Sequence, residues 1–308
     1  MRSSEVSARL SGPRETDSAF VLNNGPNKGK SDGDSSVRSN ARKYVTATRV
    51  RSLAAQLTDH DGELIDMLQR VRYASGAQIR SLLWGDGGTA ARSSRRQLAK
   101  LTGNGVIRRM SRRVGGVRSG SEGYVYSLDL AGQHIAGQAI KRRPAELSLL
   151  FIDHALALTG CYVQLKLCES RGELELLHFE AEPACWRNYS GPGGGLLTLK
   201  PDAFVITATG EWEDRWFLEV DRDSERPVRI RRKAEAHVAY WQSGREQAEG
   251  GISPRVLWIA PGEKRASQLV TTLGSLDPET WQLFQVTTDE RFAGSVTAGA
   301  GAVSEVGP

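Results

Sequence analysis

The sequence lacks the features of a secreted or membrane-bound protein. No stretch approaches the roughly 20 apolar residues that a membrane-spanning helix needs, and the first residues contain no apolar segment typical of a secretory signal. The three cysteines, Cys161, Cys168 and Cys185, are odd in number and have no metal-binding spacing, which argues against a disulfide framework. We therefore expect a cytoplasmic protein that does not contact a membrane.

Signatures of several common active sites are also missing. There is no His-hydrophobe-His pair, so the usual two-histidine metal site of relaxases is not expected. The glycine-rich segment 191–195 is not followed by the Lys-Ser/Thr of a phosphate-binding loop, and the cysteines and histidines have no zinc-ligand spacing. We expect no nucleotide or organic cofactor.

The chain does have enough apolar mass for a core, and its charge is unevenly distributed. Hydrophobic residues make up 39% of the 308 residues and charged residues 25%, which is typical of a folded protein. The net charge of +5 divides into +5 over residues 1–55, +8 over residues 56–144 and −8 over residues 145–308. This asymmetry predicts two modules with different partners, of which the basic one is a candidate for nucleic-acid binding.

Both ends of the chain have the composition of disordered tails. Residues 1–55 are rich in Gly, Ser, Asn and Arg without a periodic apolar pattern, so burial cannot offset the entropy cost of ordering them. Residues 291–308 are similar in composition. We therefore predict a disordered basic tail over 1–55, folded domains over 56–144 and 145–290, and a second disordered tail over 291–308.

The first folded domain has the pattern of a winged helix-turn-helix. Thr58 and Asp61 resemble a capping box at the start of one helix, and Thr89 is suited to cap another. A Gly/Ser-rich loop over 115–123 separates two strands and would form the wing. The expected elements are helices over 58–71, 77–84 and 89–102, a strand that begins at 106, and a returning strand over 124–128.

The third predicted helix has one apolar face and one basic face. Ser94, Leu98 and Leu101 recur at the spacing of residues that face a core. No acidic residue occurs between Asp86 and Glu122. The candidate DNA-binding residues are the cations of this helix and the wing, with one serine among them: Arg92, Ser93, Arg95, Arg96, Lys100, Arg108, Arg109, Arg112, Arg113 and Arg118.

A basic helix of this kind suits the major groove of double-stranded DNA, because its cations replace counterions condensed on the phosphates. We expect Arg92, Ser93 and Arg96 to contact base edges and the wing arginines to contact phosphates. The alternatives are a solvated basic face and a winged helix that contacts another protein. Double-stranded DNA is the predicted partner.

The second folded domain has the pattern of a mixed α/β domain. The continuous apolar run 256–260 is typical of a buried strand. Pro227 suits the first turn of a helix, with Asp223 or Ser224 as its cap. The expected elements are helices over 146–159, 225–241 and 264–273, and strands over 162–167, 174–179, 200–207, 215–221, 256–260 and 283–287.

Three carboxylates of this domain form a candidate metal site. If a hairpin pairs Asp202 with Glu219, then Asp202, Glu219 and Asp221 point to one face of the sheet. Such crowded carboxylates repel one another, so metal-free Asp202→Asn should melt at a temperature equal to or above that of the wild type. Oxygen ligands on neighbouring strands suit Mg²⁺ or Mn²⁺, which can activate water for attack on a phosphodiester. The alternative is a polar hairpin surface without a metal.

Several motifs resemble known families. The Pro-Asp and Glu-x-Asp motifs are similar to those of the PD-(D/E)XK nuclease superfamily, which implies a restriction-endonuclease-like core of a helix, a mixed sheet and a second helix. The order of motifs from about residue 57 to 288 resembles the replication-relaxation family of actinobacterial plasmids and integrative elements, which implies a DNA-binding protein of plasmid replication and DNA relaxation. The segments that carry this second resemblance are 94–101, 199–202, 217–222, 232–240 and 256–261.

The sequence departs from the nuclease pattern at one position, because Asp221 stands where that superfamily has lysine. In some members a neighbouring helix supplies the cation, and Lys233 is the candidate here. Lys200 is a second candidate, and Glu146 or Asp153 is a candidate for an additional acid. The predicted catalytic residues are Asp202, Glu219, Asp221 and Lys233, of which the three acids are the predicted metal ligands.

Two classes of function remain open from the sequence. In the first, the protein binds DNA through its winged helix and the second domain nicks DNA with Mg²⁺ or Mn²⁺. In the second, the protein is a non-catalytic regulator or replication accessory factor, and its second domain mediates dimerisation or protein docking. Further candidate partners are other replication or transfer proteins and a second copy of the chain.

Overall fold

The computed structural model describes residues 45–85, 87–113, 123–138, 148–191 and 193–299, without the side chains of 111–113. The predicted tail up to residue 44, the wing loop with Arg118, Glu146 and residues 300–308 lie outside the described residues. None of the described helices is long and apolar enough to cross a membrane.

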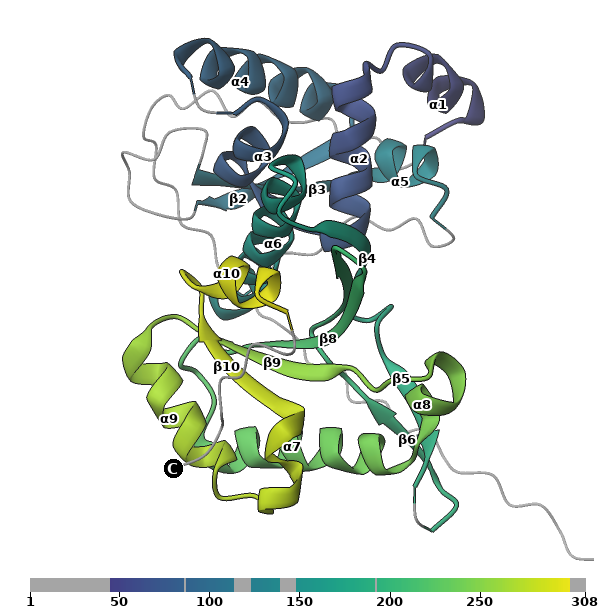
Figure 1. Ribbon diagram of the computed structural model, residues 1–308. Helices are drawn as coiled ribbons and strands as arrows, with labels where there is room; N and C mark the ends of the chain where they lie inside the picture. Colours follow the sequence, from purple (N-terminus) through teal and green to yellow (C-terminus); the bar gives the residue numbers. More distant parts are fainter. Residues whose placement is uncertain (1–44, 86, 114–122, 139–147, 192, 300–308) are drawn as a thin grey trace, which may run out of the picture. The chain divides into compact units, whose positions relative to one another are not determined.

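The N-terminal half combines helices with a small antiparallel sheet of order β1-β3-β2 (Figure 1). Its elements are α1 (Ala47–Ala54), α2 (Asp59–Val71), β1 (Ala74–Ser75), α3 (Gly76–Leu83), α4 (Gly88–Gly103), β2 (Ile107–Arg113), β3 (Tyr124–Leu128) and α5 (Leu130–Ile135). The three predicted helices and two predicted strands are confirmed. Strand β1 and helix α5 were not predicted, because two and six residues are too short to show a period.

Local capping fixes where these helices begin. Thr58 and Asp61 form the predicted capping box at the start of α2, with reciprocal bonds between side chains and backbone N–H groups. Ser75 and Gln78 form a second capping box at the start of α3. The prediction that Thr89 caps α4 is wrong, because the helix begins at Gly88 and has no side-chain cap.

The C-terminal half is built on a five-stranded sheet of order β10-β9-β8-β7-β4 (Figure 1). Strands β4, β7 and β8 are antiparallel neighbours, whereas β8, β9 and β10 are parallel. The main elements are α6 (Leu149–Ser170), β4 (Glu175–Ala181), β7 (Ala203–Thr209), β8 (Trp212–Val220), α7 (Pro227–Gln242), β9 (Arg255–Ala260), α9 (Glu263–Leu273) and β10 (Phe284–Thr288). The smaller elements are a β5–β6 hairpin (Arg187–Ser190 and Leu196–Leu199), α8 (Arg245–Gly250), the 3-10 helix η2 (Pro278–Leu283) and α10 (Phe292–Thr297).

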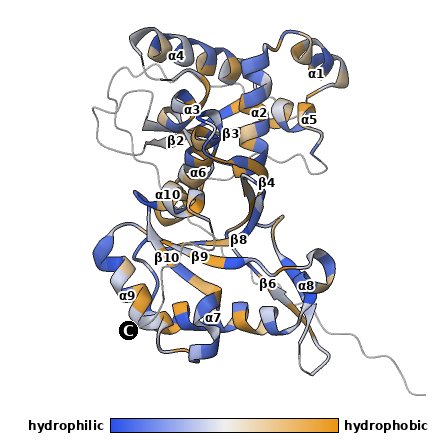
Figure 2. Cartoon of the chain, in the orientation of Figure 1, coloured by the Kyte–Doolittle hydropathy of each residue, from blue (hydrophilic) through white to orange (hydrophobic). Residues whose placement is uncertain are grey.

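The two faces of this sheet are covered by different helices. Successive side chains of a strand point to opposite faces, so Trp216 and Leu218 of β8 pack in one core with residues of α6 and α10. Phe217, between them, packs in a second core with residues of α7 and α9. Helices α7 and α9 contain both hydrophilic and hydrophobic residues, as expected for helices that cover a sheet (Figure 2). Glu219 therefore faces α7.

Helix α6 joins the two halves of the described chain. Thr159 Oγ1 donates a hydrogen bond to the carbonyl of Tyr73 (2.6 Å), and Gln78 Nε2 donates one to the carbonyl of Leu156 (2.7 Å). Buried residues of α2, α3, α6 and the sheet belong to a single hydrophobic core. The segments that the sequence divides at residue 144 are thus packed together.

The strand predicted over 162–167 is wrong, because these residues continue α6. Their side chains alternate in the manner of a strand, but Tyr162, Val163 and Leu165 are all buried in the helix. A helix that is buried on several sides lacks the single apolar stripe by which a sequence pattern identifies it.

Three further predictions need correction. Helix α1 lies inside the predicted N-terminal tail and buries Leu53, and α10 lies inside the predicted C-terminal tail and buries Phe292 and Val296. Short helices of this kind are stabilised by packing, which composition does not reveal. Helix α7 has Pro227 in its first turn as predicted, but its cap position is Arg226, not Asp223 or Ser224.

Candidate functional site

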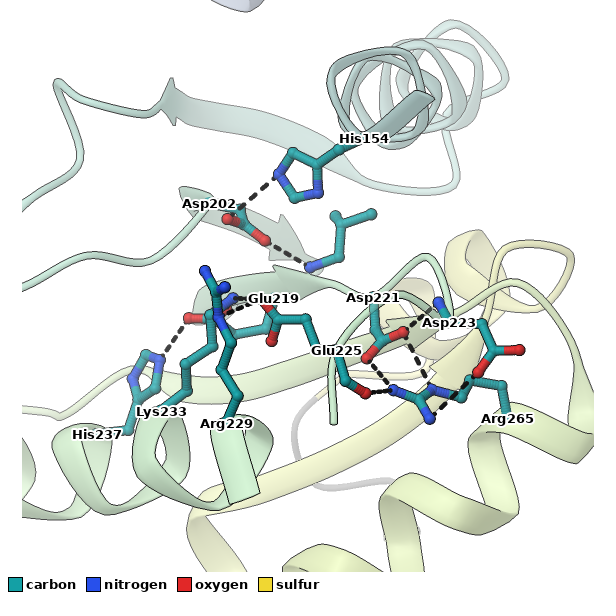
Figure 3. A network of polar contacts seen from close by, with 11 residues as sticks. His154, Asp202, Glu219, Asp221, Asp223, Glu225, Arg229, Lys233, His237 and Arg265 are labelled. Carbon is teal, nitrogen blue, oxygen red and sulfur yellow. Dashed lines mark hydrogen bonds and ion pairs between the residues drawn. The ribbon is translucent and has the colours of Figure 1, made fainter. Parts of the chain in front are cut away.

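A cavity of about 740 Å³ is lined by residues of α6, the β4–β5 connection, β6, β8 and α7. We call it the α7 cavity. Three of the four predicted catalytic residues, Asp202, Glu219 and Lys233, line it, and so do His154 and His237 (Figure 3). Asp221 does not.

The β7–β8 hairpin brings the first two carboxylates together. The ladder ends at the pair of Ala203 with Leu218, and the N–H of Asp202 donates to the carbonyl of Leu218 (3.0 Å), so Asp202 and Glu219 are the next residues of the two strands at this end. The predicted hairpin is confirmed, although its ladder does not include a pair of Asp202 with Glu219. Its consequence is that two carboxylates, 6% and 1% exposed, lie at one end of the sheet.

Asp202 is held by neighbours on two sides. Its Oδ2 accepts a hydrogen bond from the N–H of Val220 (2.7 Å), and its Oδ1 lies 3.4 Å from Nε2 of His154 on α6. Burial would raise the pKa of Asp202, but the hydrogen bond with His154 and the charge of Lys233 lower it below its usual value. The pKa of His154 is raised: burial opposes this change, and the hydrogen bond and charge of Asp202 outweigh burial.

Glu219 is neutralised by α7. Its Oε2 accepts a hydrogen bond from Nζ of Lys233 (2.9 Å), and its Oε1 lies 2.8 Å from Nε2 of His237 (Figure 3). Burial would lower the pKa of Lys233, but the charges of Glu219 and Asp202 raise it above its usual value. Lys233 is therefore a permanent cation and not a proton acceptor at neutral pH.

The structure does not bring Asp221 to the other two carboxylates. Asp221 follows the last residue of β8, and its two oxygens lie 3.1 and 2.8 Å from Nε and a terminal nitrogen of Arg265 on α9 (Figure 3). The N–H of Asp223 also donates to it. The expectation that the three carboxylates form one cluster is thus wrong, because Glu219 is bound by residues of α7 whereas Asp221 is bound by Arg265 of α9.

The predicted ligand set does not fit a divalent cation in this arrangement. Mg²⁺ and Mn²⁺ need several free oxygen ligands around one point. Both oxygens of Glu219 are engaged by Lys233 and His237, and both of Asp221 by Arg265. Asp202 is engaged by a backbone N–H and His154. Among the described residues, no three His, Cys, Asp or Glu side chains form a group able to hold a metal ion.

The other candidates from the sequence have separate roles. Lys200 lines the α7 cavity, and its Nζ lies 4.6 Å from the ring centre of Trp186. Asp153 forms an ion pair with Arg222 (3.1 Å). The sequence did not identify His154, His237 or Arg265 as partners of the carboxylates. Of these three residues, only His237 could have been found from spacing, because it lies four residues after Lys233 on the same helix.

The basic face of α4 is exposed. Ser94, Leu98 and Leu101 are buried as predicted, which confirms the orientation of the helix. On the opposite side the exposed residues are Arg92, Ser93, Arg95, Arg96 and Lys100. Within the described part of the chain, no carboxylate pairs with these cations.

The wing cations are described only in part. Arg109 on β2 is exposed, and its guanidinium lies 4.4 Å from the ring centre of Tyr124. Arg108 is half-buried. The side chains of Arg112 and Arg113, and all of Arg118, lie outside the described residues.

Comparison with known families gives a match over most of this region. A family described as replication-relaxation matches residues 65–256, which is more than half of the chain and includes both α4 and the residues that line the α7 cavity. The chain belongs to the replication-relaxation family. Membership indicates a role in the replication or relaxation of plasmid or mobile-element DNA. Neither the curated proteins nor the solved structures contain a match.

Proposed function

We propose that the protein binds double-stranded DNA in plasmid or mobile-element replication and relaxation, and that the N-terminal half acts as a winged helix. Helices α2, α3 and α4 with the β1-β3-β2 sheet have the element order of such a domain. Helix α4 would then enter the major groove, with Arg92, Ser93 and Arg96 nearest the bases. The wing strands β2 and β3 would contact the phosphates.

The observation that carries this proposal is the exposed basic face of α4. Arg92, Arg96 and Lys100 occur at four-residue steps along one side of the helix and have no carboxylate partner among the described residues. Cations of a solvated surface are usually mixed with acids, whereas cations that face DNA must stay free to replace counterions. The family match includes the whole helix.

The C-terminal half has the plan of a helix, a mixed sheet and a second helix, in the order α6, β4-β7-β8, α7 and β9. This plan supports its likeness to restriction-endonuclease-like domains. The carboxylates, however, are engaged by Lys233, His237, His154 and Arg265. We therefore assign this half a binding role, without metal-dependent cleavage of DNA.

Duplex binding is tested by fluorescence anisotropy with a labelled DNA duplex at several salt concentrations. The triple variant Arg92→Ala/Arg96→Ala/Lys100→Ala should bind at least about tenfold more weakly at low salt, because phosphate contacts dominate affinity there. The slope of log affinity against log salt should fall by about 0.9 for each phosphate contact that is lost.

The matched control is Arg171→Ala/Lys264→Ala/Arg291→Ala, which removes three exposed cations outside α4. This control should retain the affinity and the salt slope of the wild type. If both triple variants behave alike, the effect is one of net charge and the assignment of α4 is wrong.

Cleavage is tested by incubating supercoiled plasmid with the purified protein and Mg²⁺ or Mn²⁺. We expect the plasmid to stay supercoiled, because the carboxylates are engaged as described. Nicking by the wild type that disappears in Asp202→Asn would overturn the non-catalytic assignment and restore the nickase hypothesis.

A further inference from the structure

An exposed tryptophan stands at the α7 cavity. Trp186, in the connection between β4 and β5, lines the cavity and is 38% exposed. Nζ of Lys200 lies 4.6 Å from its ring centre, a cation–π contact that orients the ring and adds a positive charge beside it. A large aromatic ring left exposed beside a cation is a platform on which a flat, electron-rich group can stack.

Other cations line the same cavity. Arg229 and Arg232 on α7 are exposed, and Lys233 lies deeper. Arg229 is paired with Glu225 (3.1 Å), but Arg232 has no ion-pair partner among the described residues. Four acids line the cavity as well: Asp202 contacts His154, Glu219 contacts Lys233 and His237, Glu225 pairs with Arg229, and Glu182 is the fourth. Lys200 and Arg232 are exposed cations of this cavity that pair with none of these acids among the described residues, so they are available to a ligand.

We propose that the α7 cavity binds an unpaired strand of DNA, with one base stacked on Trp186 and the adjoining phosphates on Lys200, Arg229 and Arg232. Aromatic rings combined with a positively charged groove are the means by which proteins hold single strands. The cavity volume of about 740 Å³ is within the range of sites that enclose a small molecule such as one nucleotide. The inference rests on the proposed DNA-binding function and names a second, distinct DNA substrate for it.

The chemistry favours a single strand over a duplex. In a duplex each base is stacked on both faces by its neighbours, so its π-face is not accessible to Trp186. An unpaired nucleotide offers that face without the cost of unstacking a helix. Binding in this way needs no metal ion, which agrees with the neutralised carboxylates. The protein would thus hold duplex DNA on α4 and a melted strand in the cavity.

The test measures anisotropy of a labelled oligo(dT) of about 15 nucleotides with the full chain in EDTA. Trp186→Ala should bind it about tenfold more weakly, because one stacked base is lost, whereas Trp186→Phe should stay within about threefold of the wild type. The matched control is Trp212→Ala, which removes an exposed tryptophan at the start of β8 (80% exposed) and should leave affinity unchanged. All variants should bind a duplex like the wild type.

The Arg92→Ala/Arg96→Ala/Lys100→Ala background separates this inference from the proposed function. If oligo(dT) binding persists there and still depends on Trp186, the single-strand site stands even where duplex binding by α4 fails. Loss of oligo(dT) binding in that background would mean that the strand lies on α4, which overturns the inference. Equal affinity of Trp186→Ala and wild type, or an equal loss of duplex and single-strand binding in Trp186→Ala, would overturn it as well.

Discussion

The ammonium nitrogen of Lys233 on α7 lies 2.9 Å from a carboxylate oxygen of Glu219 on β8. Glu219 is 1% exposed, and His237, one turn further along α7, binds its other oxygen. A buried carboxylate without such partners is strongly unfavourable, so this contact stabilises the packing of α7 on the sheet. The cation that pairs with Glu219 thus comes from a neighbouring helix and not from β8 itself.

Removing the cation of this pair should destabilise the fold. We expect Lys233→Met to lower the free energy of unfolding by about 3 kcal/mol, because it leaves Glu219 buried with only His237. The double variant Lys233→Met/Glu219→Gln should lose less than the sum of the two single changes. Urea unfolding followed by circular dichroism measures all three values.

Lys264→Met is the control for this series, since Lys264 is an exposed lysine on α9. It should change the free energy of unfolding by no more than about 0.5 kcal/mol. Strictly additive losses in the double variant would show that Lys233 and Glu219 do not stabilise each other.

The pair His154–Asp202 should make stability depend on pH. Because the pKa of His154 is raised in the folded state, His154 contributes to the free energy of unfolding. This contribution is complete below about pH 6.5 and is lost as the pH rises through the pKa of His154 in the folded protein. Because the pKa of Asp202 is lowered in the folded state, Asp202 makes a stabilising contribution that is complete above about pH 4. It is lost as the pH falls through the pKa of Asp202 in the folded protein. Between these limits His154→Gln should therefore cost most, about 1–3 kcal/mol, and the cost should shrink toward pH 8.

Thermal or urea unfolding of the wild type and of His154→Gln across this pH range measures the difference in stability between the two proteins. Glu182 raises the pKa of His154 and Lys233 lowers it, so Glu182→Gln should reduce the pH dependence without abolishing it. A difference in stability between wild type and His154→Gln that is constant from pH 5 to about pH 8 would show that the pair His154–Asp202 does not make stability depend on pH.

Because Asp202 is held by attractive contacts, Asp202→Asn should melt at a lower temperature than the wild type. This is opposite to the effect expected from crowded carboxylates.

Asp221 and Arg265 form a buried pair that we expect to be structural. Arg265→Met should lower the free energy of unfolding by about 3–5 kcal/mol, because it leaves the carboxylate of Asp221 buried without its cation. Arg291→Met removes an exposed arginine paired with Glu263 (3.1 Å) and should cost no more than about 1 kcal/mol. Similar losses in the two variants, measured by urea unfolding, would show that burial of the first pair has no energetic consequence.

Much of the fold and half of the site could be predicted from the sequence. The β7–β8 hairpin follows from two apolar runs separated by a polar turn. Its ladder ends at Ala203 and Leu218, which leaves Asp202 and Glu219 at the same end of the two strands. Spacing on α7 also identified Lys233. These features are local, or depend on one pairing whose period is fixed by the strand.

The remaining features depend on contacts between distant segments. Arg265 lies 44 residues after Asp221, and His154 lies 48 residues before Asp202, so no spacing rule connects them. Arg265 and His154 reach these carboxylates because α9 and α6 pack on the sheet. The carboxylates looked like metal ligands because their compensating cations could not be seen in the sequence.

The neutralised state of Glu219 leads to a last prediction about metal ions. A divalent cation next to Glu219 would lie beside the ammonium of Lys233, and this like charge opposes binding. The wild type should therefore show no rise in melting temperature when Mn²⁺ is added. Lys233→Met removes the repulsion and frees one oxygen of Glu219 beside Asp202, so this variant should be stabilised by Mn²⁺.

Metal at about 100 times its dissociation constant adds about 2.7 kcal/mol to the stability of the folded state, which corresponds to a rise of several degrees. Thermal unfolding with Mn²⁺ or EDTA measures it. Lys233→Met/Glu219→Gln should lose the response, because the oxygen that Lys233 leaves free is no longer part of a carboxylate, and Lys264→Met should behave like the wild type. A wild type that melts higher with Mn²⁺, and does so only while Asp202 and Glu219 are intact, would mean that the metal displaces Lys233. The carboxylates would then be a metal site held closed by the helix, and cleavage of the strand bound beside Trp186 would have to be tested again.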